Sequence, residues 1–271
     1  MSKPPLPRGL FPAQLKYWRG RRGMSQLDLA LAADVSSRHV SFLETARARP
    51  SPEMVLRLGS ALRLPLRDQN AMLVAAGLEE AYPESAPRRE LSDPVARALD
   101  TMLAGHEPFP MLIMDRHYDV RQMNRGAEAL FHRVIAEPSA ATPPLNVIRA
   151  AFDHRLARPF IEDWERLARA LLSRLYRESL ERPSDEGLAG LVEELLSAPD
   201  IPAEWRQPEF ATVSEPVLSV TFATGDLRLS FLTAVTVFNA PQNVALEETR
   251  IESYFPLDDA TAEACASLGR G

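Results

Sequence analysis

Cysteine is almost absent from this sequence, because Cys265 is the single one among 271 residues. One cysteine cannot form a disulfide within the chain, and an isolated thiol is typical of a reducing cytoplasm. Long apolar runs are also missing: stretches such as FLTAVTVF have the length of a strand and fall far short of the ~20 residues of a membrane span. The opening MSKPPLPRGLF is too rich in proline for a signal peptide. We therefore expect a soluble cytoplasmic protein without a membrane segment.

The sequence motifs of common enzymes are missing as well. There is no glycine-rich phosphate loop, no GxSxG, no HExxH and no Cys/His zinc spacing. The five histidines show no spacing that suits metal ligands. The sequence thus predicts no catalytic residues, no metal and no cofactor. It disfavours an enzyme, including one that carries a DNA-targeting module.

The charge that is present is distributed unevenly. Residues 1–80 hold 12 Lys/Arg and 7 Asp/Glu, a net charge of +5, whereas the remainder holds 19 basic and 30 acidic residues, a net charge of −11. A basic part can bind a polyanion that an acidic part would repel. Together with the chain length, this asymmetry favours two domains with different partners.

The first part of the chain shows helical patterns throughout. Proline at positions 12 and 52 suits a first helical turn, and Ser25 and Ser36 suit N-caps. The predicted helices cover residues 12–22, 25–33, 36–44, 52–62 and 66–76. We expect a flexible segment over 1–11, an all-α five-helix domain over 12–78 and a polar, proline-interrupted linker over 79–94.

The part beyond the linker, residues 95–271, has strands as well as helices. The predicted elements are two short strands within 111–124 that turn near Arg116–His117, helices over 94–103, 125–135, 155–181, 185–197 and 258–268, a hairpin over 216–239 around Thr224-Gly225-Asp226, and a strand over 247–256. This order resembles a PAS-like antiparallel sheet with a long helical insertion. The predicted fold class of the whole chain is therefore α+β, in two domains.

Residues 25–44, SQLDLALAADVSSRHVSFLE, have the pattern of two helices that meet at a tight turn. Apolar or small residues supply the inner face: Leu29, Ala30, Ala33, Val35, Val40 and Leu43. The opposite face of the second helix carries Ser37, Arg38, Ser41 and Phe42. A face of this kind can enter the major groove of DNA.

Residues 12–78 resemble the lambda-repressor-like (Cro/C1-type) helix-turn-helix family through GMSQLDLA, VSFLE and TARARPSPEMVLRLGSAL. The resemblance implies that Arg19 pairs with Glu44, and that Gln26 braces the second helix and touches a phosphate. One departure is Ala46, where the family has a glycine in a left-handed turn. The predicted DNA-binding residues are Gln26, Ser36, Ser37, Arg38, Ser41, Phe42, Arg47 and Arg49. Two alternatives stay open, namely that the arginines at 47 and 49 are solvated and that Phe42 packs against a neighbouring helix.

Residues 95–256 resemble the ligand-binding domain of MmyB-like transcription regulators. The similar segments include PFPMLIMDRHYDVRQMNRGAEALF, PPLNVIRAAF, FIEDWERLARALLSRL, LAGLVEELL and LSFLTAVTVF. Met123 stands where the family usually has tryptophan before Asn124. The resemblance implies a sensor of small molecules and leaves the signal open.

An apolar cavity under the sheet would suit such a sensor. The candidate lining residues are Met111, Ile113, Met123, Asn124, Phe131, Phe152, Trp164, Leu167, Leu229, Phe231, Val235 and Tyr254. Methionine side chains adapt to varied ligands, and Asn124 could anchor a polar head, so the expected ligand is apolar and fatty-acid-like. The alternative is that these residues form an ordinary core.

The leading hypothesis is a transcription regulator that binds a double-stranded DNA operator as a homodimer and responds to a small-molecule effector. The rival is an antitoxin-like or scaffold-like DNA-binding protein whose second domain binds a protein. A closed cavity would favour the first reading and an exposed apolar groove the second.

Overall fold

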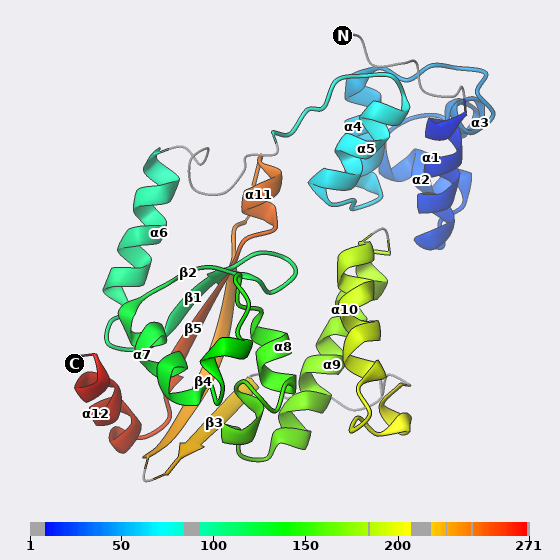
Figure 1. Cartoon of the computed structure of the whole chain (residues 1–271). Coiled ribbons are helices and arrows are strands. Elements are labelled where there is room, and N and C mark those ends of the chain that lie inside the picture. The colour runs from blue at the N-terminus through cyan, green and yellow to red at the C-terminus, as the bar shows by residue number, and fades with distance from the viewer. Residues whose placement is uncertain are drawn as a thin grey trace. The chain divides into compact units, whose positions relative to one another are not determined.

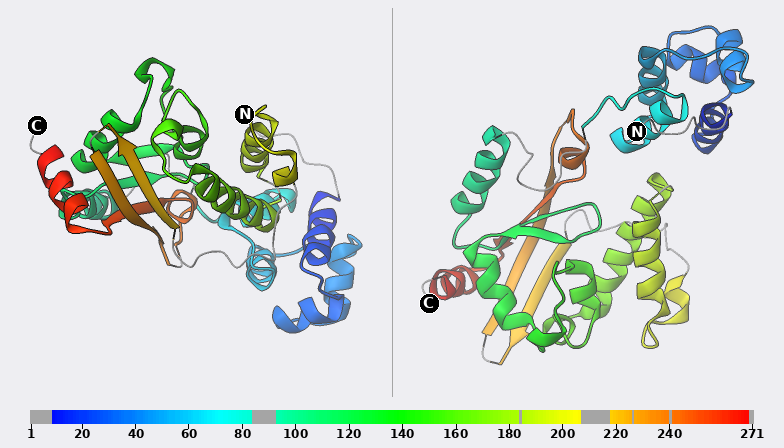
Figure 2. Two further views of the ribbon diagram at one scale, coloured as in Figure 1. Left: turned by 90° about the horizontal axis from the view of Figure 1, so that it is seen from below. Right: turned by 45° about the horizontal axis from the view of Figure 1, so that its top comes forward.

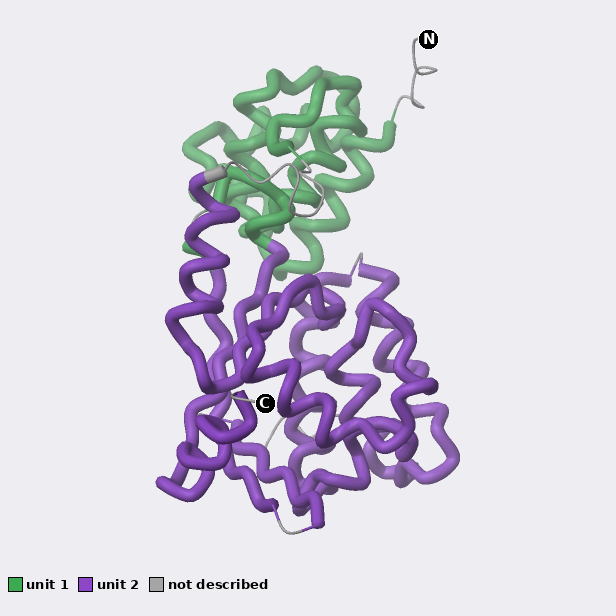
Figure 3. The backbone as a smooth tube through the Cα atoms, turned by 60° about the vertical axis from the view of Figure 1, so that its left-hand side comes forward, with its two compact units in different colours: residues 1–86, 238–247 green, residues 87–237, 248–271 purple. Residues whose placement is uncertain are grey.

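The computed structural model describes residues 9–83, 93–183, 185–206, 218–225, 227–239 and 241–269. The chain forms two compact units, which Figure 3 colours separately. One unit contains residues 1–86 and 238–247, and the other contains residues 87–237 and 248–271. A short segment from late in the sequence therefore belongs to the N-terminal unit.

Five helices build most of the first unit (Figure 1): α1 (Leu10–Arg21), α2 (Gln26–Ala32), α3 (Ser37–Glu44), α4 (Pro52–Ala61) and α5 (Leu66–Ala75). Ser25, Ser36 and Ser51 cap α2, α3 and α4 by accepting hydrogen bonds from backbone N–H groups three residues later. One correction concerns the start of α1, since Leu10 and Phe11 were expected in the flexible segment. Phe11 is buried, and this packing extends the helix to Leu10.

The helices of the first unit enclose a single apolar cluster. Leu15, Leu29, Val40, Leu43 and Leu58 are fully buried in it. The predicted inner face of α2 and α3 is thus confirmed, with Val35 packed at its edge.

The late segment in the first unit includes the short helix α11 (Val244–Glu247). The predicted strand 247–256 is therefore wrong at its start: Glu247 ends α11, and the strand begins at Arg250. The side chain of Val244 is fully buried, and α11 packs against α5.

The second unit contains a five-stranded antiparallel sheet, seen in both views of Figure 2. Its strands are β1 (Met111–Met114), β2 (Val120–Met123), β3 (Leu218–Thr224), β4 (Leu227–Val237) and β5 (Arg250–Pro256), in the spatial order β2-β1-β5-β4-β3. Gly225 has φ 58° in the tight turn between β3 and β4, a conformation that glycine adopts easily. The expected antiparallel sheet is confirmed, and the chain is α+β.

The helices of the second unit are α6 (Asp93–Gly105), α7 (Arg125–Val134), α8 (Val147–Phe152), α9 (Trp164–Glu181), α10 (Glu186–Ser197) and α12 (Asp259–Leu268), with 3₁₀ turns η1 (Pro138–Ala140), η2 (Arg158–Phe160) and η3 (Ala203–Arg206). The predicted helix 155–181 is wrong over its first nine residues. Asp163 has φ 47°, and this left-handed residue precedes the true start at Trp164. Ile161 bridges Phe222 of β3 instead of lying on the helical stripe. Among the described residues, no helix has the length and apolar character needed to cross a membrane.

Candidate nucleic-acid interface and ligand cavity

The outward face of α3 carries the residues predicted to read DNA. Ser36, Ser37 and Arg38 are exposed, and the Arg38 guanidinium lies 5.2 Å from the centre of the Phe42 ring. Phe42 is half-buried, so part of its ring still faces solvent. Arg38 and Phe42 therefore present a cationic group and an apolar surface side by side, which suits contact with guanine edges and thymine methyl groups.

A buried carboxylate braces this face from behind. Arg19 donates to Glu44 at 2.6 and 3.1 Å, and the Gln26 amide donates to Glu44 at 2.7 Å. Burial disfavours the Glu44 charge, but the hydrogen bonds from Arg19 and Gln26 prevail and lower the pKa of Glu44. The predicted pairing of Arg19 with Glu44 is confirmed, and Gln26 joins it. The phosphate contact of Gln26 stays a prediction.

The turn after α3 keeps its left-handed residue although the glycine is replaced. Ala46 has φ 58°, the Ala46 N–H donates to the Leu43 carbonyl, and the Arg47 N–H donates to the Phe42 carbonyl at 2.8 Å. These two bonds make a Schellman motif. Arg47 and Arg49 follow it as exposed side chains that form no ion pair with the described residues. They are therefore available to phosphates.

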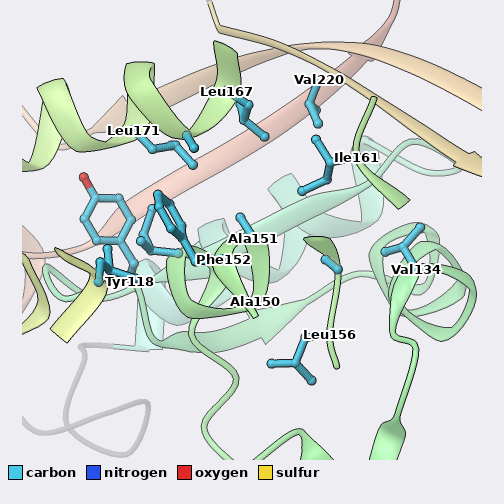
Figure 4. Packing of buried hydrophobic residues seen from close by; sticks show 14 of the residues in the cluster. Tyr118, Val134, Ala150, Ala151, Phe152, Leu156, Ile161, Leu167, Leu171 and Val220 are labelled. Atoms are coloured by element: carbon cyan, nitrogen blue, oxygen red, sulfur yellow. The ribbon is translucent and has the colours of Figure 1, made fainter. Parts of the chain in front are cut away.

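The second unit has a partly open cavity lined by residues of its sheet and of the helices α8 and α9. Figure 4 shows some of these residues, among them Tyr118, Leu167 and Val220, packed in the apolar core. The lining residues are Tyr118, Phe131, Val147, Ile148, Ala150, Ala151, Ala157, Ile161, Leu167, Leu171, Arg174, Leu218, Val220, Phe222, Thr233, Glu252 and Tyr254. About 60 Å³ of this space can hold the centre of a water molecule. Since one water needs ~10–15 Å³ on this measure, the cavity has room for a small group as it stands. A longer molecule requires the lining to move.

Phe131, Leu167 and Tyr254 are the predicted ligand-binding residues that line this cavity. The structure does not bring the others to it: Met111, Ile113, Met123, Asn124, Phe152, Trp164, Leu229, Phe231 and Val235. Their contacts give the reasons. Phe231 is fully buried and packs edge-on against Tyr254, and Trp164 packs against Phe152. Phe231 thus supports the lining residue Tyr254, and the Trp164 indole N–H donates to the carbonyl of the lining residue Ala151.

Asn124 has a structural partner for each polar atom of its side chain. Its carbonyl accepts from the N–H groups of Met111 and Ala127, and its amide donates to the carbonyls of Leu103 and Phe109. It therefore caps α7 and joins that helix to β1. Nothing in this arrangement leaves Asn124 available as the anchor for a polar ligand head.

Sequence reasoning missed the polar residues that line the cavity. Arg174, Glu252 and Tyr118 were not among the candidate ligand-binding residues, yet all three line the cavity. One signal could have found Glu252, because alternation along β5 puts it on the same face as Tyr254. Burial raises the pKa of Glu252 and raises that of Tyr254 well above its ordinary value. The cavity thus combines a largely apolar lining with groups that can hold one polar atom of a ligand.

A partly buried cluster of charges borders the polar side of the cavity. The Tyr118 hydroxyl donates to Glu178 at 2.8 Å, and Arg250 donates to both Glu178 oxygens at 2.9 and 2.8 Å. Arg174 donates to the same carboxylate at 3.2 Å. Burial opposes ionisation of Glu178, but the bonds and charges of Arg250 outweigh it and lower its pKa. The cluster fixes the start of β5 against α9.

Comparison with known proteins gives two family matches. Residues 95–268 match the MmyB-like transcription regulator ligand binding domain, and residues 15–69 match a helix-turn-helix family. A solved structure of the clp gene regulator ClgR from C. glutamicum is 31% identical over 27% of this chain and 92% of its own, with a TM-score of 0.24. No curated protein sequence matches the chain. In the described residues, no group of three or more His, Cys, Asp or Glu is placed to hold a metal ion.

Proposed function

Since this chain belongs to the MmyB-like transcription regulators, we propose that it is a sequence-specific DNA-binding regulator whose second unit senses a small, largely apolar molecule with one polar end. The observation that supports the sensing part is the cavity of the second unit, where apolar walls meet Arg174, Thr233 and Glu252. A fatty-acid-like molecule fits this chemistry, because its chain matches the walls and its head matches the polar group. We propose no catalytic activity.

On the DNA side, α3 is the recognition helix. Arg38 and Phe42 contact base edges, and Ser37 and Ser41 flank them on the same helix face. The remaining predicted residues contact the phosphate backbone of the DNA and orient the unit on it: Gln26, Ser36, Arg47 and Arg49. Arg38→Ala should cost ~1–3 kcal/mol of binding free energy and relax the preference at one base position. Arg49→Ala should instead weaken binding to all sequences alike, with a smaller salt dependence.

The test is a selection of duplexes from a random pool by the full chain, followed by titration of the selected operator with each variant. Arg49→Ala is the matched control, since it removes the same charge outside α3. If Arg38→Ala kept both the affinity and the sequence preference of the wild type, α3 would not be the reading helix.

The ligand is tested by native mass spectrometry of the full chain, followed by extraction of any bound molecule. Decanoic acid and decanol then serve as probes that share a chain and differ in the head. We expect a probe to bind in the second unit and to change operator affinity, and Leu171→Trp, which narrows the cavity, to weaken the probe. If no probe changed operator affinity and the chain instead captured a protein, the antitoxin-like or scaffold-like function would replace the sensor.

We also propose that the regulator acts as a homodimer. A single helix-turn-helix unit reads few base pairs, and such units commonly bind two half-sites one helical turn apart. Analytical ultracentrifugation of the full chain, free and on the selected operator, measures this directly. A monomer in both states would overturn the proposal.

A further inference from the structure

The segment between β4 and β5, residues 238–247, leaves the sheet and belongs to the DNA-binding unit. We call it the arm. The strand order does not explain the length of the arm, because two neighbouring antiparallel strands such as β4 and β5 can be joined by a short turn. The register runs without interruption up to Val237 opposite Arg250, so the arm begins where pairing ends.

The arm is anchored on α5 by specific contacts. Val244 is fully buried, and its N–H donates to the carbonyl of Pro83. The Glu247 carboxylate accepts from the Leu66 N–H at 2.8 Å. Leu66 is the first residue of α5, and Pro65 before it supplies no side-chain cap. A carboxylate from the arm thus takes the place of the missing cap, where a negative charge is favourable.

The residue that follows the arm is held in the other unit. Glu248 accepts from Arg116 at 2.6 Å, and Arg116 also lies 3.1 Å from the Asp185 carboxylate. Asp185 caps α10 by accepting from the Leu188 N–H. Two consecutive carboxylates, Glu247 and Glu248, are therefore bound in different units.

The same strand leads directly to the cavity. Arg250 begins β5 and holds Glu178, which accepts from the cavity-lining Tyr118. Further along β5, Glu252 lines the cavity, and on β4 Thr233 does so. A bound molecule that displaces Tyr118 or Glu252 therefore acts on β5, directly at Glu252 or through Glu178 at Arg250. Arg250, the first residue of β5, lies only two positions after Glu248.

We infer that the arm is the element through which the ligand cavity controls the DNA-binding unit. This inference rests on the proposed function, since it names how that cavity is read out. An occupant changes the position of β5 and, through Glu247, the N-terminus of α5. A ligand shifts DNA affinity only when it favours one of two arrangements, and the arm belongs to the DNA-binding unit while it joins two strands of the sheet that carries the cavity.

The experiment is a double-mutant cycle on operator affinity, measured with the selected operator and the full chain. Ala151→Leu fills the cavity from within and stands in for a ligand, and Val147→Phe is a second filling variant in case the first does not fold. Glu247→Ala removes the anchor on α5, and Val244→Asp disrupts the buried contact. Gln242→Ala is the control, because it changes an exposed residue of the same arm.

We expect a filling variant to change the operator Kd by about 5-fold or more, in the range of ordinary allosteric coupling. The change should persist with Gln242→Ala and vanish with Glu247→Ala or Val244→Asp, where the Kd of each arm variant with the unfilled cavity is the reference for its own filled form. An undiminished effect in both arm variants overturns the arm and leaves the sensor intact. No effect of either filling variant, nor of decanoic acid or decanol, overturns the sensor and the arm with it.

Discussion

Ala46→Gly should stabilise the helix-turn-helix unit. Ala46 holds the left-handed conformation, which costs an L-residue with a Cβ roughly 1–2 kcal/mol, and glycine removes this cost. Glycine also has more conformational freedom in the unfolded chain, and this lowers the free energy of unfolding by about 0.4–1 kcal/mol. Because the Ala46 side chain is exposed, its removal loses little packing. The expected net gain is therefore about 0.5–1 kcal/mol.

The assay is native-state hydrogen exchange of the α3 amides in the full chain, which reports the free energy of opening for this unit alone. Ala32→Gly is the matched control, because Ala32 is an exposed alanine in the last position of α2. There, glycine should cost up to about 1 kcal/mol, the opposite sign. If Ala46→Gly left the protection of α3 unchanged or reduced it, the strain assigned to Ala46 would be absent.

Three further outcomes follow from the second unit. Burial raises the pKa of Glu252, so its contribution to stability is complete below the unfolded pKa and lost as pH rises through the folded pKa. Glu252→Gln should therefore stabilise the protein at neutral pH. It should also make the free energy of unfolding, measured with urea, less dependent on pH between the unfolded and the folded pKa of Glu252. Glu178 has a lowered pKa, so its contribution is present at neutral pH and lost as pH falls through the folded value. Glu178→Gln should destabilise at pH 7 by about 3 kcal/mol, with the difference shrinking in acid, since the buried Arg250 and the half-buried Arg174 lose their charged partner. Asn124→Ala should cost about 2–4 kcal/mol in the same assay by uncapping α7 and orphaning buried groups, and Asn124→Asp should also destabilise, because it keeps the accepting oxygen but sets a second oxygen against the carbonyls of Leu103 and Phe109.

Local chemistry was sufficient to predict the DNA-binding unit. Helix periods of three and four residues, serine caps and the short turn between the two helices specify α2 and α3, because each acts within a few residues of the chain. The Arg19–Glu44 pair followed from the family resemblance and is present in the structure. Alternating strands and the turn at Gly225 likewise predicted the hairpin of the second unit.

Only the tertiary structure decided which side chains face the cavity and where the chain between β4 and β5 goes. An apolar side chain on a strand or helix has the same pattern whether it lines a cavity or supports the lining from behind, so Trp164 and Phe231 could not be told from Leu167. Arg174 and Glu178 lie one turn apart on α9, but Tyr118 and Arg250 of β5 join them only through long-range packing, which no local period records. The arm docks on α5 through Val244 and Glu247, whose neighbours in space are far from them in the sequence.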